Sequence, residues 1–257
     1  MKSKAEIVAN WLPRYTGTSI EEIGKFILLT PFFDYVQRFS NRFNSPIRGL
    51  GFPMQTCTNS EKLTIINFGM GSPNAATIMD LLTAVGPKAV LFLGKCGGTK
   101  KVTEIGHYVL PTAAIRGEGT SNDYADVIVP ALPSFKLHKF VSEKIRQANT
   151  EYRTGVVYTT NRRVWEHDAE FRERLRRLKI IAIDMETATI FTVGLMNDIA
   201  RGALLLVSDL PMTPEGVKTE AKDRVVTEKY VDEHLEIGIQ AMTEIGTKGE
   251  RIKHFSF

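Results

Sequence analysis

Hydrophobic positions in this chain form short apolar runs that alternate with longer amphipathic stretches. The apolar runs have the length of strands and are bounded mostly by Gly or Pro, at residues 26–30, 63–68, 89–94, 108–115, 154–159, 180–184 and 203–208. The stretches between them have helical periodicity, at residues 33–43, 73–85, 135–149, 169–178, 186–197 and 223–245. This alternation predicts an α/β fold in which helices cover both faces of a sheet.

Length and composition narrow this prediction to one ordinary globular domain. The chain has 257 residues, of which 43% are hydrophobic and 24% charged, and it contains no internal repeat. We therefore expect residues 1–257 to form a single domain. The 33 basic and 29 acidic residues give a net charge of +4, which suits a small anionic ligand but not an extended nucleic-acid surface.

The cysteine and histidine pattern excludes several classes of site. Cys57 and Cys96 form neither a CxxC motif nor a Cys/His cluster, and the five histidines share no metal-ligand spacing. We therefore expect no disulfide framework, no metal and no cofactor, as suits a reducing cytoplasm. No segment approaches the ~20 apolar residues of a membrane span, so we expect no membrane partner.

Acidic residues follow two of the predicted strands. Asp184, Met185 and Glu186 come after the apolar run 179–183, and Ser208 and Asp209 follow the run 203–207. Ligands of open α/β sheets bind at the carboxyl ends of strands, so these acids are predicted to meet at one small molecule. For Asp184 alone, we favour the alternative that it caps the helix that follows.

A glycine turn leaves the strand at residues 63–68. It contains Gly69 and Gly71, followed by Ser72 as a natural N-cap and Pro73 at the first helical position. Amides at such a helix start favour an anion or a sugar hydroxyl. The alternative is a tight turn that only requires glycine, and without a third glycine the motif is not a dinucleotide fingerprint.

The order of these motifs resembles the purine nucleoside phosphorylase and nucleosidase superfamily. That order is the glycine turn, the segment Gly-Lys-Cys-Gly-Gly at 94–98, Asp-Met-Glu, and then Ser-Asp, and the resemblance covers about residues 26–245. It implies a three-layer α/β sandwich with a central mixed sheet. It also implies that Asp209 protonates N7 of the departing purine, that Glu186 holds the ribose hydroxyls, and that Met185 lies under the sugar. A positioned general acid contributes roughly 10²- to 10⁴-fold to rate.

Departures from the phosphorylase pattern favour water as the nucleophile. Hexameric phosphorylases bind phosphate through a Gly-Asp-Pro turn with a following Arg, an Arg in the strand before the Gly-x-Cys-Gly turn, and a Ser within that turn. This chain has Thr-Pro-Phe-Phe-Asp-Tyr at 30–35, Leu-Phe-Leu at 91–93, and Lys95 in place of the Ser. Free phosphate would therefore lose its bidentate arginine contacts.

Among the hydrolytic members, the chain is similar to the AMP nucleosidases. The segments that carry this similarity are 91–98, 115–124 and 158–163. The resemblance implies hydrolysis of AMP to adenine and ribose 5-phosphate by a homo-oligomer, a hexamer built from dimers. Long members carry an N-terminal regulatory region. Only about 25 residues precede the first predicted strand here, so we expect a short form without that region.

Candidate substrate-binding residues lie in loops beside these motifs. For the 5′-phosphate the cationic candidates are Lys95, Arg48, Arg116, Arg162 and Arg163, with Arg48 acting in a neighbouring subunit, although any one arginine could simply be solvated. Tyr158 is equally a base-stacking or a core aromatic residue, and Asn161 lies beside it. Glu118 could bind a ribose hydroxyl, activate water or cap a turn, and Gly71 and Ser208 complete the candidate set.

Two other functions compete with this hypothesis. A purine nucleoside phosphorylase would have to rebuild a phosphate site from Lys95 and a loop arginine. A nucleotide-binding protein without catalysis would retain the fold, but it would need no proton donor such as Asp209 at the purine.

Overall fold

The sheet organises this molecule. The computed structural model describes residues 2–248, and these form a mixed nine-stranded sheet in the order β2-β3-β4-β1-β5-β8-β7-β6-β9. The strands are β1 (Phe26–Thr30), β2 (Ile47–Arg48), β3 (Gln55–Thr58), β4 (Leu63–Asn67), β5 (Ala89–Gly98), β6 (Tyr108–Gly117), β7 (Tyr152–Thr160), β8 (Ala182–Asp184) and β9 (Arg201–Asp209). β1 runs parallel to β4 and β5, whereas β3 runs antiparallel to β4. The predicted α/β class with a central mixed sheet is confirmed.

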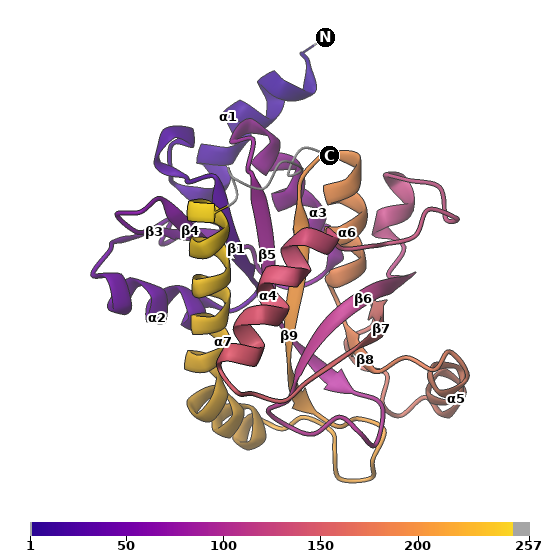
Figure 1. Cartoon of the computed structure of the whole chain (residues 1–257). Coiled ribbons are helices and arrows are strands. Elements are labelled where there is room, and N and C mark those ends of the chain that lie inside the picture. Colours follow the sequence, from indigo (N-terminus) through magenta and orange to yellow (C-terminus); the bar gives the residue numbers. More distant parts are fainter. Residues whose placement is uncertain (1, 249–257) are drawn as a thin grey trace.

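Half of the sheet closes on itself. β5 pairs with β8 at one edge and with β9 along most of its length, while β9 pairs with β6, β6 with β7, and β7 with β8. These five strands therefore form a small closed barrel, from which β1, β4, β3 and β2 extend as an open wing (Figure 1). Closure forces strands distant in sequence to end close together.

Helices cover both faces of the sheet. One layer contains α1 (Lys4–Thr16), α3 (Ser72–Leu81) and α6 (Thr187–Met196), and the other contains α2 (Phe33–Phe43), α4 (Phe135–Gln147) and α7 (Glu220–Lys248). α5 (Ala169–Arg177) lies at one end of the barrel. The described part of the chain also contains short 3₁₀ helices at Ile20–Glu22, Leu82–Ala84 and Thr120–Asp123. Within residues 2–248, no helix is both long and apolar enough to cross a membrane.

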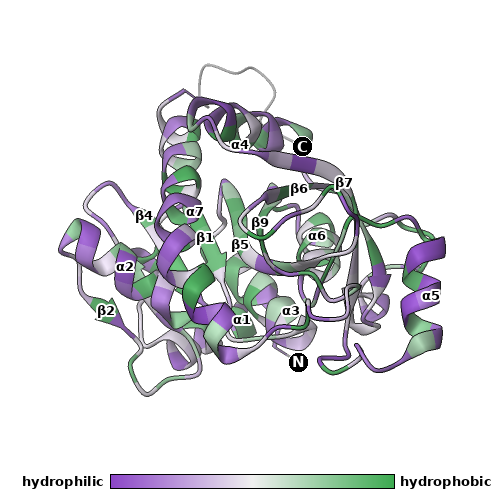
Figure 2. Cartoon of the chain, turned by 90° about the horizontal axis from the view of Figure 1, so that it is seen from below, coloured by the Kyte–Doolittle hydropathy of each residue, from purple (hydrophilic) through white to green (hydrophobic). Residues whose placement is uncertain are grey.

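The central strands contribute side chains to two hydrophobic cores, one on each face of the sheet. Ile27 and Leu29 of β1 pack into the core beneath α1, α3 and α6, whereas Leu28 between them packs into the core beneath α2 and α7. This alternation follows from the two-residue period of a strand, and it makes the strand apolar throughout because both faces are buried. Figure 2 shows β1 and β5 as hydrophobic strands between the helices, whereas α5 is largely hydrophilic.

The predicted element boundaries agree best with the structure where the hydrophobic pattern is uninterrupted. The bounds predicted for β1 and α2 match the structure, whereas β5 continues to Gly98 and β8 begins only at Ala182. The pattern did not predict α1, β2 or β3. β3 contains three polar residues in four, and α1 contains Pro13. The α1 helix begins at a capping box of Ser3 and Glu6 and ends at Gly17, whose φ of 61° suits glycine.

Candidate active site

The carboxyl ends of β5, β8 and β9 meet at Gly97. Gly97 is paired with Ile183 of β8 on one side and with Asp209 of β9 on the other, where the β5–β9 register shifts. A Cβ atom at Gly97 would lie 2.8 Å from Pro211 Cγ and 3.3 Å from Asp209 Oδ2, so a side chain here would clash with Pro211 and crowd the Asp209 carboxylate. Gly97 thus allows the two acidic segments to flank one strand end, as the sequence predicts.

Asp184 serves the first turn of α6. Its Oδ2 accepts hydrogen bonds from the amides of Glu186 and Thr187 at 3.1 and 2.7 Å, and its Oδ1 accepts one from Thr159 Oγ1 at 2.7 Å. Asp184 is buried, and these bonds use the acceptor capacity of both its oxygens. Asp184 thus binds the amides that lead into α6, although the N-cap position of the helix is Glu186, and these bonds fix the backbone that presents Glu186.

Glu186 is buried and held by the glycine turn. The Gly71 amide donates to Glu186 Oε1 at 2.7 Å, and Ser72 Oγ donates to the Met185 carbonyl at 2.6 Å. The turn therefore binds the Met-Glu segment in this structure. Burial, reinforced by the charge of Asp184, raises the pKa of Glu186 to about 8. Glu186 can therefore change protonation state near neutral pH.

Asp209 has the environment of a proton donor. Its side chain is largely buried, and Ser208 Oγ donates to Asp209 Oδ1 at 2.6 Å. Burial raises the pKa of Asp209, and the hydrogen bond from Ser208 offsets part of that effect. A carboxyl group with a raised pKa is protonated over a wider pH range, which general-acid catalysis requires.

A pocket opens at this meeting point of the strands. Six of the residues predicted from sequence line it: Lys95, Arg162, Met185, Glu186, Ser208 and Asp209. Arg163, named with the cationic candidates, lines it as well. The other lining residues are Pro31, Phe32, Met70, Cys96, Gly97, Thr160, Trp165, Glu166, Ile183, Asp184, Pro211 and Lys218. Within residues 2–248, no group of three His, Cys, Asp or Glu side chains is placed to hold a metal ion.

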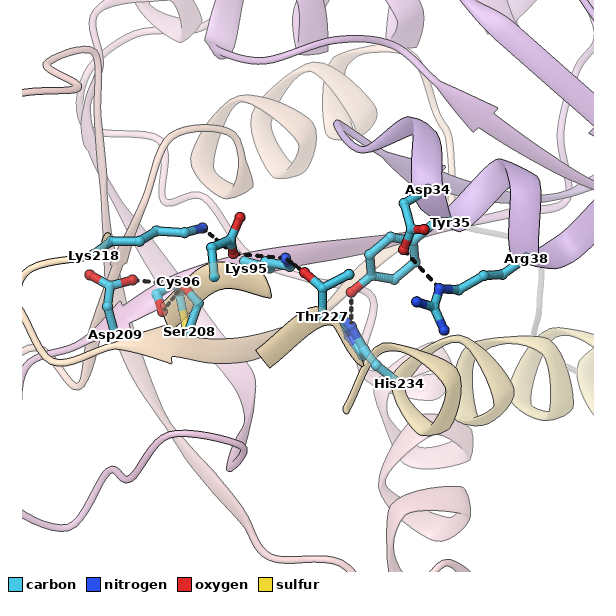
Figure 3. Close-up of polar contacts among 11 residues, drawn as sticks. Asp34, Tyr35, Arg38, Lys95, Cys96, Ser208, Asp209, Lys218, Thr227 and His234 are labelled. Carbon is cyan, nitrogen blue, oxygen red and sulfur yellow. Dashed lines mark hydrogen bonds and ion pairs between the residues drawn. The ribbon is translucent and has the colours of Figure 1, made fainter. Parts of the chain in front are cut away.

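Two lysines in the pocket share one carboxylate. Lys95 Nζ and Lys218 Nζ lie 2.9 and 2.8 Å from the same oxygen of Asp223, and Lys95 also donates to Thr227 Oγ1 at 2.7 Å. Lys95 Nζ lies 4.9 Å from the centre of the Phe32 ring, and burial lowers the pKa of Lys95. Figure 3 shows Lys95 and Lys218 pointing toward each other, with Asp209 and Ser208 beside Lys218. The group carries a net positive charge that suits an anion.

Two residues predicted from sequence instead organise the loop after β6. The Arg116 guanidinium donates to the carbonyls of Ser121, Ala125, Asp126 and Val129 and to the side chains of Ser121 and Asn122. Buried Glu118 accepts from the amides of Gly119 and Ser121 and from Thr189 Oγ1 at 2.8 Å. Neither side chain lines the pocket, and Glu118 makes the turn contacts that were one of its three alternatives.

The remaining candidates also lie away from the pocket lining. Arg48 is exposed on β2, and its Nη2 atom lies 3.6 Å from Glu22 Oε1. Tyr158 is buried, with its ring 5.7 Å from that of Phe171, so it occupies the core position that was one of its two alternatives. Asn161 is exposed directly after β7.

Comparison with known proteins places this site in a family. The family model described as Phosphorylase superfamily matches residues 18–245. The chain belongs to the phosphorylase superfamily. Two of its superfamily relatives are similar over much of the chain. The AMP nucleosidase of Escherichia coli strain K12 is 28% identical to this chain, and the match covers 94% of this chain and 59% of that protein. The guanosine phosphorylase of Halorubrum lacusprofundi is also 28% identical, and the match covers 71% of this chain and 76% of that protein. The chain thus spans about three fifths of the E. coli protein.

Solved structures of this superfamily agree with the fold. The crystal structure of AMP nucleosidase from Bacteroides thetaiotaomicron is 50% identical, with a TM-score of 0.85, and the match covers 95% of this chain and 99% of that one. A uridine phosphorylase structure from Vibrio fischeri shares the fold. It is 20% identical, with a TM-score of 0.78, and the match covers 88% of this chain and 94% of that one. The resemblance to AMP nucleosidases inferred from the sequence motifs is confirmed.

Sequence reasoning missed three prominent pocket residues of this superfamily member. Trp165 and Glu166 lie in the loop between β7 and α5, and Lys218 lies in the loop between β9 and α7. Both loops leave the carboxyl ends of strands that pair with motif strands, and this position was the available signal. Their mixed composition gave no further indication.

Proposed function

We propose that this protein hydrolyses the N-glycosidic bond of AMP, releasing adenine and ribose 5-phosphate. The observation that carries the proposal is that Asp209 and Glu186, from the segments at the ends of β9 and β8, line one pocket together with Lys95 and Lys218. The similarity to AMP nucleosidases from E. coli and B. thetaiotaomicron supports it.

The proposed reaction separates charge between the sugar and the base. As the C1′–N9 bond breaks, its electron pair moves to the purine, and Asp209 donates a proton to N7. Positive charge develops on the ribose, where Glu186 binds the hydroxyls and Met185 forms an apolar contact. Water then bonds to C1′ and releases a proton to solvent, and Asp209 takes up a proton from solvent before the next turnover. Each acid thus acts where charge develops in the transition state.

For the 5′-phosphate we propose Lys95 and Lys218 as the principal ligands. Both face the pocket and already hold a carboxylate oxygen, so a phosphate oxygen could take the place of Asp223. Arg162 lines the same pocket, but its Nη1 lies 2.8 Å from Asp168 Oδ2 and its guanidinium lies over the Phe171 ring. The arrangement supports a nucleotide substrate because a 5′-phosphate would make charge-assisted contacts with both lysines that an uncharged nucleoside cannot supply.

We further propose a cytoplasmic homo-oligomer, a hexamer built from dimers, to which Arg48 contributes across an interface. Cys57 and Cys96 are both free and buried, which suits a reducing compartment. Arg48 is exposed near Leu50 and Phe52, which are 65% and 46% exposed, and a subunit interface would cover such apolar side chains. Light scattering of the purified protein gives the subunit number directly.

The decisive assay follows base release from AMP and from adenosine, each with and without inorganic phosphate. We expect adenine and ribose 5-phosphate from AMP at a rate that does not depend on phosphate, and a much slower reaction of adenosine. Release from adenosine that requires phosphate and yields ribose 1-phosphate would instead make the protein a phosphorylase.

A further inference from the structure

Glu166 lies at the pocket but belongs to neither acidic motif. It is in the loop between β7 and α5, and its side chain is 15% exposed. Its Oε2 atom accepts a hydrogen bond from the Trp165 amide at 3.0 Å. The Trp165 side chain is itself buried, with its ring 5.5 Å from that of Phe171. One oxygen of Glu166 is therefore fixed by the backbone of an anchored residue.

The other oxygen is available to a ligand. No side chain or amide within residues 2–248 donates a hydrogen bond to Glu166 Oε1, and its nearest cation, Arg163 Nη1, is 3.8 Å away and belongs to a side chain that is 55% exposed. The Glu166 side chain as a whole is mostly buried and lines the pocket. Such an oxygen at a pocket wall is suited to accept a hydrogen bond from a substrate.

Glu166 also lies near the proposed proton donor. Both residues line the same pocket, and the charge of Glu166 contributes to the raised pKa of Asp209. With Asp209 as proton donor and Glu166 as hydrogen-bond acceptor, the pocket would present one donor and one acceptor to a bound base. Adenine presents the complementary pair on one edge, with N7 as an acceptor and the 6-amino group as a donor, whereas 6-oxo purines present two acceptors there.

We propose that Glu166 Oε1 accepts a hydrogen bond from the 6-amino group of the purine and so selects 6-amino over 6-oxo purine nucleotides. This inference rests on the proposed function, because it takes Asp209 to face N7. A 6-oxo purine would place its O6 against the carboxylate, and two acceptors facing each other leave both groups unsatisfied. Glu166 is a specificity-determining residue in this account and transfers no proton.

Glu166→Gln tests the assignment because the Trp165 amide fixes the orientation of the new side chain. The amide oxygen of Gln remains with the Trp165 N–H, so the NH₂ group faces the substrate and now donates. We expect the ratio of kcat/KM for AMP to that for IMP to fall by roughly 10- to 100-fold, the range of discrimination for one base-edge contact. Glu170→Gln, an exposed change on α5, is the matched control and should leave the ratio unchanged.

The outcomes separate this inference from the proposed function. Wild-type protein that releases no base from AMP would refute the function itself. If wild type releases adenine and Glu166→Gln lowers the rates with AMP and IMP equally, Glu166 only supports the loop, and the specificity assignment is wrong. An unchanged ratio with unchanged rates would also overturn it. A fall in the ratio with hypoxanthine release increased above that of wild type supports the assignment.

Discussion

Three buried acids near Gly97 differ in how their hydrogen-bonding capacity is used. Asp184 accepts two amides and two hydroxyl groups, which commits it to the start of α6. Glu186 accepts one amide, from Gly71, and Asp209 accepts one hydroxyl, from Ser208. The two acids with remaining acceptor capacity are those we propose to act on the substrate, because the number of partners already present limits what a carboxylate can bind.

Glu186→Gln should change how stability depends on pH. The pKa of Glu186 is raised from 4.5 to about 8 on folding, so between these values the unfolded chain loses this proton while the folded protein keeps it. The free energy of unfolding of the wild type therefore falls as pH rises through this window. The Gln side chain stays neutral at every pH and can still accept a hydrogen bond from Gly71, so the variant does not show this fall. Relative to wild type, the free energy of unfolding of the variant should rise from pH 5 to pH 8 by on the order of a few kcal/mol.

Urea unfolding of both proteins at several pH values measures this difference. Glu228→Gln, an exposed change on α7, serves as the control and should show no such trend. A difference between Glu186→Gln and wild type that stays constant from pH 5 to pH 8 would mean that Glu186 is not protonated in the folded protein at neutral pH.

For single residues, the sequence predicted the acidic side chains of the pocket better than the basic ones. Asp209 and Glu186 follow apolar strands whose ends are predictable, so their position at the sheet edge follows from local pattern. Arg116 and Lys218 have no such signal. The six hydrogen bonds of Arg116 depend on the path of the loop at 121–129, and the contact of Lys218 with Asp223 depends on where α7 begins.

Among the elements, α7 and the loop before it link the sheet to the pocket. The first turns of α7 present Asp223 and Thr227 to Lys95 at the end of β5, and Lys218 reaches the same carboxylate from the loop. Farther along α7, buried His234 accepts from Tyr35 Oη or donates to it at 2.8 Å, and its other ring nitrogen lies 3.0 Å from the Leu204 carbonyl of β9. The helix is thus fixed against the sheet below the pocket.

Replacing Lys218 with Met should weaken AMP binding selectively. The change keeps most of the unbranched side chain and removes its charge. One lost charge-assisted hydrogen bond, about 1.5–3 kcal/mol, should raise KM for AMP by roughly 10- to 100-fold. Steady-state kinetics with AMP measure this effect. Lys222→Met is the matched control, because Lys222 bonds the Glu215 carbonyl and does not line the pocket. Equal KM values for the two variants would exclude Lys218 from phosphate binding.

Element boundaries show why local patterns predict some parts of the fold and not others. β1 and α2 are predictable because an unbroken apolar run and a regular helical period each determine the structure. β5 continues beyond Gly94 because β9 and β8 pair with its last residues, and long-range pairing of this kind leaves no periodicity in the segment itself. β3 has three polar residues in four, so it contains no apolar run from which the sequence could predict a strand.

For the molecule as a whole, closure of the sheet creates the site. A flat sheet would separate β8 from β9, but in the barrel both strands pair with β5 and place Asp184–Glu186 and Ser208–Asp209 around Gly97. The two helical layers bury both faces of the strands, which leaves the carboxyl-end loops free to line the pocket. The α/β class was predictable from the alternation of elements and the mixed sheet from the family resemblance, whereas the closing strand pairs required the structure.

The central claim is that Asp209 donates the proton that releases the purine. The most direct test compares adenine release and AMP binding for wild type and Asp209→Asn, with binding measured by calorimetry. We predict that turnover falls by roughly 10²- to 10⁴-fold while the dissociation constant for AMP changes little, because Asn keeps the shape but cannot act as the acid. Turnover by Asp209→Asn close to that of wild type would contradict the proposed mechanism.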